Sequence, residues 1–183
     1  MDNIISKSIK IVEGVISNEM IDGMKGLAEL RKILKPIVEK EENYIANITT
    51  LGKEDAGKYP PSKEYDFTKM DSELYNIFNK AILEYVKDFK ELGISKDNGY
   101  FYLKYQDEKE HDFYQDGKLG AVAAILYLND DYEGGELEFK YIDMRIKPQK
   151  GDILLFPSNY LFTLKSRPIT KGEKHVIITW FGE

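Results

Sequence analysis

The stretch LYLNDDYEGGELEF, residues 126–139, decides the fold of this chain. It begins inside an apolar run, passes through the polar triplet 129–131 and the glycine pair 134–135, and ends in alternating polar and apolar residues. Short runs of aliphatic and aromatic residues bounded by such turn residues are typical of strands. The stretch therefore predicts one strand over residues 121–128 and a second over residues 136–140.

The same alternation of short strands and turns continues on both sides of this stretch. Further strands are expected at residues 100–105, 142–146, 152–156, 161–166 and 174–181, with turn residues between them. Short strands at this even spacing indicate a β-sandwich or a jelly-roll barrel.

The first half of the chain has a different pattern, which predicts a short strand and two helices. Residues 7–12 alternate like a strand, and Ser17 or Asn18 can then cap a helix that Pro36 ends or kinks. Apolar residues recur again at helical spacing over residues 68–89. This second apolar stripe is expected to pack against a sheet.

We therefore expect a single α+β domain over residues 1–183. Residues 1–98 form a helical support region with a first strand and, at residues 41–67, a long irregular loop that can contain short strands. Residues 99–183 form the β core, and the N-terminal helices buttress one of its sheets.

Composition excludes several classes of function. The chain has no cysteine, which excludes disulfides, zinc–thiolate sites and thiol nucleophiles. Its net charge of −6 and its interspersed acids and bases give no basic surface for nucleic acid. No apolar run approaches the roughly 20 residues of a membrane span, and the N-terminus lacks the apolar region of a signal peptide. A cytoplasmic location is the expectation.

Three ordered motifs of the second half resemble a known family. These are residues 126–139, then PQKGDILLFPS at residues 148–158, and then RPITKGEK at residues 167–174 followed by Trp180. Together they resemble the prolyl 4-hydroxylase-like members of the 2-oxoglutarate/iron(II) oxygenase superfamily. The resemblance implies a double-stranded β-helix, which is a jelly-roll or cupin-like barrel. It also implies two cofactors, iron(II) held by two histidines and a carboxylate, and 2-oxoglutarate held by a basic residue.

The resemblance places the binding of 2-oxoglutarate on three residues. The basic residue falls on Lys174, and Tyr105 and Tyr127 match aromatic positions that line the co-substrate pocket of relatives. In a strand, Lys174 would share a face with Val176 and Trp180, and an inward lysine among apolar residues needs an anionic partner. A solvated lysine and two core aromatics are the alternative interpretation.

The resemblance also implies that the metal-binding triad is degenerate. The first histidine and the carboxylate of the family's H-x-D motif fall on Tyr114 and Asp116, and the distal histidine falls on Leu164. Leucine has no donor atom, and a tyrosine phenol must lose a proton of pKa about 10 to bind a metal well. His111 is a substitute ligand only if a bulge or loop turns it inward, and His175 should face away from Lys174.

Two functional hypotheses follow from these residues. In the first, the oxygenase fold has a lost or altered metal site, needs no cofactor, and serves as a binding protein for a small molecule, a peptide or a partner subunit. In the second, the chain is an active dioxygenase that hydroxylates a peptidyl or small-molecule substrate. Asp116 with Tyr114 or His111 then holds iron(II), and Lys174 holds 2-oxoglutarate. A purely structural jelly-roll module is a third interpretation, and the oligomeric state is left open.

Overall fold

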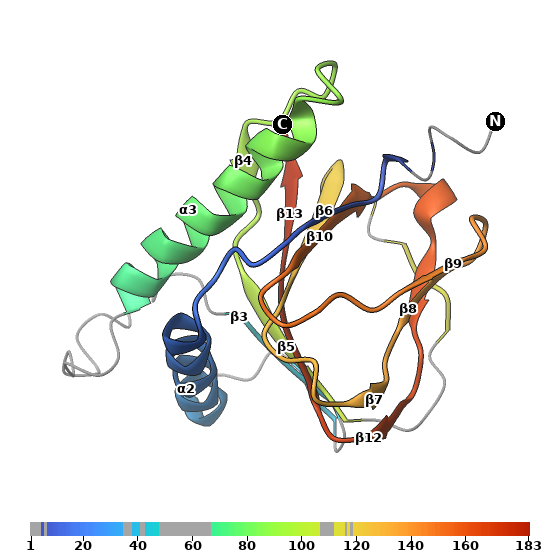
Figure 1. Ribbon diagram of the computed structural model, residues 1–183. Helices are drawn as coiled ribbons and strands as arrows, with labels where there is room; N and C mark the ends of the chain where they lie inside the picture. The colour runs from blue at the N-terminus through green and yellow to red at the C-terminus, as the bar shows by residue number, and fades with distance from the viewer. Residues whose placement is uncertain are drawn as a thin grey trace.

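The computed structural model describes residues 5, 7–34, 38–40, 43–47, 67–106, 112–115, 117 and 119–183. These residues form two helices and a set of long and short strands. Helix α2 spans Asn18–Leu34 and helix α3 spans Phe67–Val86. Both lie on the same side of a large sheet, and the shorter strands lie on its other side (Figure 1).

The large sheet has eight strands in the order β1-β10-β6-β13-β5-β3-β2, with β4 paired to β13. The bounds of these strands are β1 Lys10–Val12, β2 Val38–Lys40, β3 Asn43–Asn47, β4 Lys96–Asp97, β5 Phe101–Tyr105, β6 Val122–Tyr127, β10 Ile153–Pro157 and β13 Lys174–Gly182. All of its pairs are antiparallel. Strands β1, β2 and β3 come from the first half of the chain, so the region expected to be mainly helical also contributes to the central sheet.

The opposite wall is built from shorter strands. A three-stranded sheet has the order β11-β8-β9, with β8 Leu137–Phe139, β9 Met144–Ile146 and β11 Leu164–Ser166, and a two-stranded sheet pairs β7 Glu133–Gly134 with β12 Ile169–Lys171. The segment expected as a strand from residue 161 begins instead with the 3-10 helix η1, Tyr160–Phe162, because the Asn159 side chain caps it by accepting from the Leu161 N–H. This mostly β architecture with two helices is the double-stranded β-helix that the sequence predicts.

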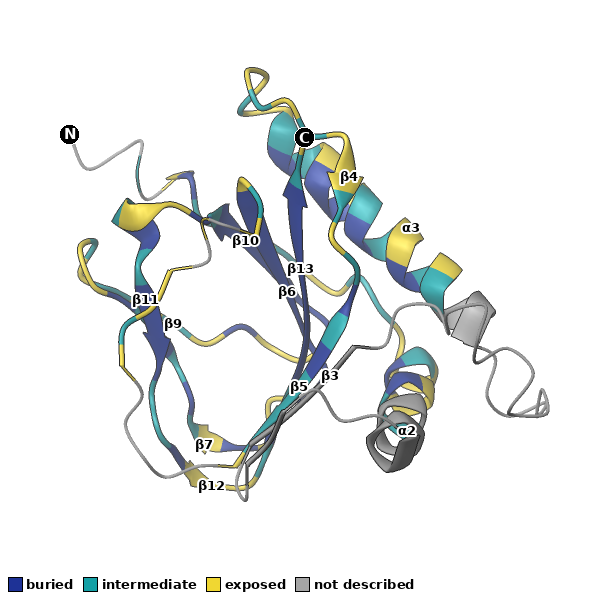
Figure 2. Ribbon diagram, turned by 180° about the vertical axis from the view of Figure 1, so that it is seen from behind, coloured by how far each residue is buried: buried dark blue, intermediate teal, exposed yellow. Residues whose placement is uncertain are grey.

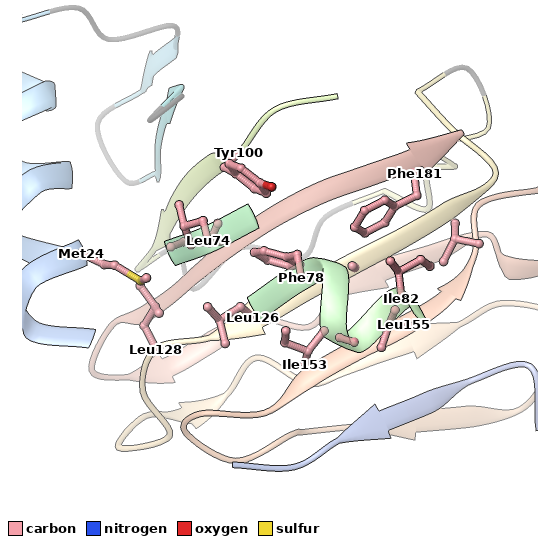
Figure 3. Close-up of a cluster of buried hydrophobic side chains, with 14 of the residues drawn as sticks. Met24, Leu74, Phe78, Ile82, Tyr100, Leu126, Leu128, Ile153, Leu155 and Phe181 are labelled. Carbon is pink, nitrogen blue, oxygen red and sulfur yellow. The ribbon is translucent and has the colours of Figure 1, made fainter. Parts of the chain in front are cut away.

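Successive side chains along the central strands point to opposite faces of the sheet, and this alternation separates two hydrophobic cores. On β6, Val122, Ala124 and Leu126 face the helices, whereas Ala123, Ile125 and Tyr127 face the barrel interior. The helix-facing core takes the buried stripe of α3, which comprises Leu74, Phe78, Ala81, Ile82 and Tyr85 (Figure 3). This confirms that the apolar stripe packs against a sheet.

The barrel interior is the second core, and its strands are buried on both faces. Figure 2 shows β6, β10 and β13 almost wholly in the colour of buried residues. Interior side chains come from both walls, including Phe139 and Leu164 from the short strands and Val176 and Trp180 from β13. A lysine at the start of β13 is the one charged side chain placed on this interior face of β13, and the candidate site is built around it.

Candidate ligand site in the barrel

Lys174 is the first residue of β13 and is only 2% exposed. Val176, Ile178 and Trp180, which lie two, four and six residues further along the strand, belong to the interior core. Strand alternation therefore turns Lys174 into the barrel, on the face that the sequence predicts. The neighbouring His175 faces the other way, where its Nδ1 lies 2.6 Å from the Tyr102 hydroxyl.

Four groups surround the Lys174 ammonium, three from the strands β5, β6 and β11 and one from Gly135, which follows β7. It donates to the Gly135 carbonyl at 2.8 Å and to Ser166 Oγ at 3.4 Å. It also lies over the rings of Tyr105 and Tyr127, 5.6 and 5.4 Å from their centroids. The structure thus brings together Lys174, Tyr105 and Tyr127, the three residues predicted to bind 2-oxoglutarate.

Sheet register explains why these residues meet. Tyr105 is directly opposite Lys174 in the β5–β13 pair, and Tyr127 is opposite Val176 in the β6–β13 pair. Directly opposite residues in an antiparallel pair project from the same face of the sheet. The two tyrosines therefore lie on either side of the lysine, one from each neighbouring strand.

The surroundings of Lys174 do not neutralise its charge with an ion pair. Among the described residues, no carboxylate forms an ion pair with it, and its bonds go to a carbonyl and a hydroxyl. Burial lowers the pKa of Lys174 to about 7, with a further lowering by Lys147 that the charge of Glu136 opposes. An anion that entered the site would stabilise the protonated amine and gain a strong charge-assisted hydrogen bond.

Tyr127 supplies a second polar group that has no partner. Its hydroxyl is buried and forms no hydrogen bond. Burial, together with the nearby phenols of Tyr132, Tyr114 and Tyr105, holds the pKa of Tyr127 well above its usual range, so this hydroxyl stays protonated as a donor. Leaving a buried hydroxyl unpaired costs about 1–3 kcal/mol, which a ligand oxygen would recover.

Sequence analysis missed three parts of this site, namely Ser166, the Gly135 carbonyl and Tyr132. The Tyr132 hydroxyl is also buried without a partner, and Lys147 lies 4.2 Å from the centroid of its ring. Ser166 lies two residues after Leu164 on β11, so strand alternation could have placed it on the interior face. The Gly135 carbonyl is a backbone group with no sequence signal of its own.

The two positions that the resemblance assigns to histidines form a cross-strand pair. Tyr114 and Leu164 are joined by an isolated antiparallel bridge in which each backbone N–H donates to the other's carbonyl at 2.9 Å. Their side chains therefore share one face, and Leu164 belongs to the interior core. Two histidines placed here could approach one metal ion, but the residues present are a buried leucine and a tyrosine that is 39% exposed.

Of the two positions that the resemblance assigns to histidines, the one held by Leu164 cannot ligate iron(II). Leu164 has no donor atom and is 1% exposed among interior hydrophobic residues. No cluster of three or more His, Asp or Glu side chains that could hold a metal occurs among the described residues, which do not include His111 and Asp116. By contrast, the buried Lys174 and the unpaired Tyr127 hydroxyl fit one carboxylate end of 2-oxoglutarate.

The buried lysine should leave a signature in the pH dependence of stability. Its pKa is about 7 in the folded protein, against 10.5 for an ordinary solvated lysine, so the unfolded chain binds more protons between these values and stability rises with pH there. Compared with the Lys174→Met variant, we expect the wild-type free energy of unfolding to rise between pH 7 and pH 9, by at most about 1.4 kcal/mol per pH unit. Urea unfolding of both proteins at each pH measures these free energies. Free energies of unfolding that change equally with pH in the wild type and the variant would contradict the prediction.

Comparisons with known proteins agree with this architecture. Residues 94–182 match the family model of the 2OG-Fe(II) oxygenase superfamily. Prolyl 3-hydroxylase 2 of Homo sapiens is 36% identical over 64 residues, which are 32% of this chain and 9% of that protein. A PKHD-type hydroxylase of Alteromonas mediterranea is 37% identical over 62 residues, 33% of this chain and 26% of that protein. The chain therefore matches less than a third of the length of either relative.

A solved structure extends the similarity of fold to the whole chain. The viral collagen prolyl hydroxylase of Paramecium Bursaria Chlorella virus-1, solved as a 2OG complex, superposes with a TM-score of 0.68 at 16% identity and covers 99% of both chains. At this identity the likeness shows the fold alone. In the part of the chain that the structure describes, no helix has the length and apolar character needed to span a membrane.

Proposed function

We propose that this chain, a prolyl hydroxylase-like relative of the 2OG-Fe(II) oxygenases over residues 94–182, binds a carboxylate ligand in its barrel without the two-histidine iron site of that superfamily. In this function the protein is a binding protein, and Lys174 is the residue that recognises the anionic group. Tyr127 donates a second hydrogen bond, and Tyr105 lies against the other side of the ammonium.

The observation that carries the proposal is the pairing of a buried cation with a buried unpaired donor. Lys174 is 2% exposed without an ion-pair partner among the described residues, and the hydroxyl of Tyr127, whose ring centroid lies 5.4 Å from the ammonium, has no hydrogen bond. Both groups are donors, and both lie on one face of adjacent strands. A carboxylate, with two acceptor oxygens, satisfies both at once.

The Tyr114–Leu164 pair supports a role that does not depend on iron(II). Leu164 packs in the interior core, whereas Tyr114 is 39% exposed, so the pair contributes at most roughly 0.2–1 kcal/mol of stability. The backbone pairing of the two positions is present, whereas Leu164 has no donor atom for a metal. This combination is what a barrel used for binding requires.

An active dioxygenase is the second candidate, and the match to the superfamily favours it. In that case Tyr114, Asp116 or His111 would hold iron(II), which would activate dioxygen and accept the 2-oxo acid end of 2-oxoglutarate. Lys174 would bind the other carboxylate. Release of succinate from 2-oxoglutarate by the purified protein with iron(II) would establish this alternative over the first.

Titration with glutarate tests the proposal. Trp180 is the only tryptophan of the chain and lies in the interior core, so its fluorescence reports on the barrel. Because a hydrogen bond to a charged group contributes about 1.5–3 kcal/mol, Lys174→Gln should weaken glutarate binding roughly ten- to a hundredfold.

Lys171→Gln is the matched control, because Lys171 lies on the surface, where it pairs with Glu133 at 3.0 Å. Its glutarate affinity should equal that of the wild type. Equal affinities of the wild type and Lys174→Gln would overturn the proposal, as would the failure of every carboxylate tested to bind the wild type.

A further inference from the structure

Strand β6 ends before its neighbour β13 does, at the end of the pair where Lys174 lies. The last paired residue of β6 is Tyr127, which is opposite Val176, and continuing this register places Asn129 opposite Lys174. On its other side Lys174 is paired with Tyr105 of β5. The start of β13 therefore has a strand neighbour on one side and, on the other, only the residues that follow β6.

The side chain of Asn129 replaces the backbone pairing that β6 no longer supplies. Its Oδ1 accepts from the His175 N–H at 2.8 Å, and its Nδ2 donates to the Glu173 carbonyl at 2.7 Å. These two backbone groups belong to the residues directly before and directly after Lys174. One side-chain amide therefore holds the main chain on both sides of the lysine, as a neighbouring strand would.

The Asn129 amide is itself held in place. Asn129 is buried, and its Nδ2 gives a second hydrogen bond to Asp131 Oδ1 at 2.6 Å. This hydrogen bond lowers the pKa of Asp131, so the carboxylate stays ionised as an acceptor. An amide has an acceptor oxygen and, on a separate atom, two donor hydrogens. All three functions are used here, and alanine supplies none of them.

Lys174 needs a fixed main chain because the burial of its ammonium is unfavourable. The ammonium exchanges water for a carbonyl, a hydroxyl and two aromatic rings, without an ion-pair partner among the described residues. This cost favours any movement of β13 that returns the ammonium to solvent. Lys174 is also the first residue of its strand, and the ends of elements open more readily than their centres.

We infer that Asn129 is a positioning residue, which holds the start of β13 in the sheet so that Lys174 points into the barrel between Tyr105 and Tyr127. Its consequence for ligand binding rests on the proposed function, in which Lys174 recognises the carboxylate. In this role Asn129 acts through the backbone of the two residues beside Lys174, and not by contact with the ligand.

Titrations of the full chain with glutarate at pH 7, 8 and 9, followed by Trp180 fluorescence, test the inference. Glutarate binds protonated Lys174, whose pKa is about 7 in the folded protein, so the wild-type affinity should fall by up to about tenfold per pH unit. In Asn129→Ala the ammonium should reach solvent and regain an ordinary lysine pKa, above this range. The affinity of this variant should be roughly tenfold below that of the wild type at pH 7, yet nearly level up to pH 9.

This pH profile reports on the placement of the ammonium. The charges that act on it, those of Glu136 and Lys147, are the same in the variant. Tyr105 and Tyr127 are phenols, which ordinarily titrate near pH 10, and burial raises the pKa of Tyr127 further. Burial lowers the pKa of His175, so its imidazole is neutral throughout the range. A variant that was merely less stable, with Lys174 still in the barrel, would keep the slope of the wild type.

Urea unfolding at the same pH values gives a second readout, which needs no ligand. The rise in unfolding free energy between pH 7 and pH 9 that Lys174 gives the wild type should disappear when Asn129→Ala is compared with Asn129→Ala/Lys174→Met. Asn129→Ser, whose single oxygen replaces the oxygen and nitrogen of the amide, should give an intermediate result and serves in place of Asn129→Ala if that variant does not fold.

Asn159→Ala is the matched control, because it removes an asparagine that accepts a backbone hydrogen bond from Leu161 at the start of η1. It should keep the pH profiles of the wild type. If Asn129→Ala keeps them as well, the inference is wrong and the proposed function stands. If the wild type does not bind glutarate, the proposed function is wrong, and the unfolding series alone decides whether Asn129 holds Lys174 in the barrel.

Discussion

The double variant Tyr114→His/Leu164→His is expected to bind Mn(II) roughly a hundredfold or more tightly than the wild type, since even the loss of an outer-shell partner changes metal affinity by about 10–100-fold. The two positions form a cross-strand pair held by two backbone hydrogen bonds of 2.9 Å, so their side chains project from one face. Two imidazoles in this arrangement can approach a single divalent ion, whereas the present Leu164 offers it no donor atom. Anaerobic calorimetric titration with Mn(II) measures the gain.

The matched control is Tyr114→Asn/Leu164→Asn, which makes the same two positions polar without supplying imidazole. It should show no gain, and thermal unfolding of both double variants shows whether the barrel tolerates polar groups at a position that is 1% exposed in the wild type. Adding Asp116→Ala to the histidine variant should reverse most of the gain, because the resemblance assigns Asp116 as the carboxylate ligand. A folded histidine variant with wild-type Mn(II) affinity would show that Tyr114 and Leu164 do not occupy the ligand positions.

The placement of Lys174 was predictable because it depends only on local rules. Alternation along one uninterrupted strand fixes the face on which Lys174 lies relative to Val176 and Trp180, and the structure confirms this face. The helix-facing stripe of α3 was predictable for the same reason, since period and burial are both properties of one element. The binding role of Lys174, Tyr105 and Tyr127 remains a prediction.

Contacts between distant segments were not predictable from local rules. The Lys174 ammonium bonds to Gly135 and Ser166, which are 39 and 8 residues away in the chain. These bonds depend on how β7, β11 and β13 converge, which no single segment encodes. Short strands were allowed within residues 41–67, but the pairing of β3 with β5 was not predicted, because that stretch has no clear strand period. The predicted metal residues His111 and Asp116 lie outside the described residues, so their placement stays a prediction.

Tyr114 and Leu164 are assigned to the metal site by the family resemblance, and the structure shows how the two residues are arranged. The family motifs place Tyr114 and Leu164 at the two histidine positions, and the structure independently shows that these residues are paired across two strands. The pairing explains how a metal site could be built at this point of the barrel.

Gly134→Ala is expected to destabilise the protein by about 3 kcal/mol, combining about 1–2 kcal/mol for a left-handed backbone with about 1–3 kcal/mol for overpacking. Gly134 has a φ of 76°, and a Cβ atom added there would lie 2.1 Å from the Pro168 carbonyl oxygen. This oxygen belongs to the backbone, so it cannot move aside without disturbing the β7–β12 pair, in which Gly134 is opposite Ile169. Urea unfolding followed by Trp180 fluorescence measures the loss.

The control for this variant is Gly23→Ala, which makes the same chemical change within α2. A Cβ atom at Gly23 would meet nothing within 4 Å, and alanine in a helix interior is favoured over glycine by roughly 0.5–1 kcal/mol, so Gly23→Ala should stabilise the protein.

Gly134→Ala should also weaken carboxylate binding, because the next residue, Gly135, supplies the carbonyl that holds the Lys174 ammonium at 2.8 Å. If Gly134→Ala were as stable as the wild type, the tight approach of β7 to β12 would be wrong, and with it the position of the carbonyl that orients Lys174.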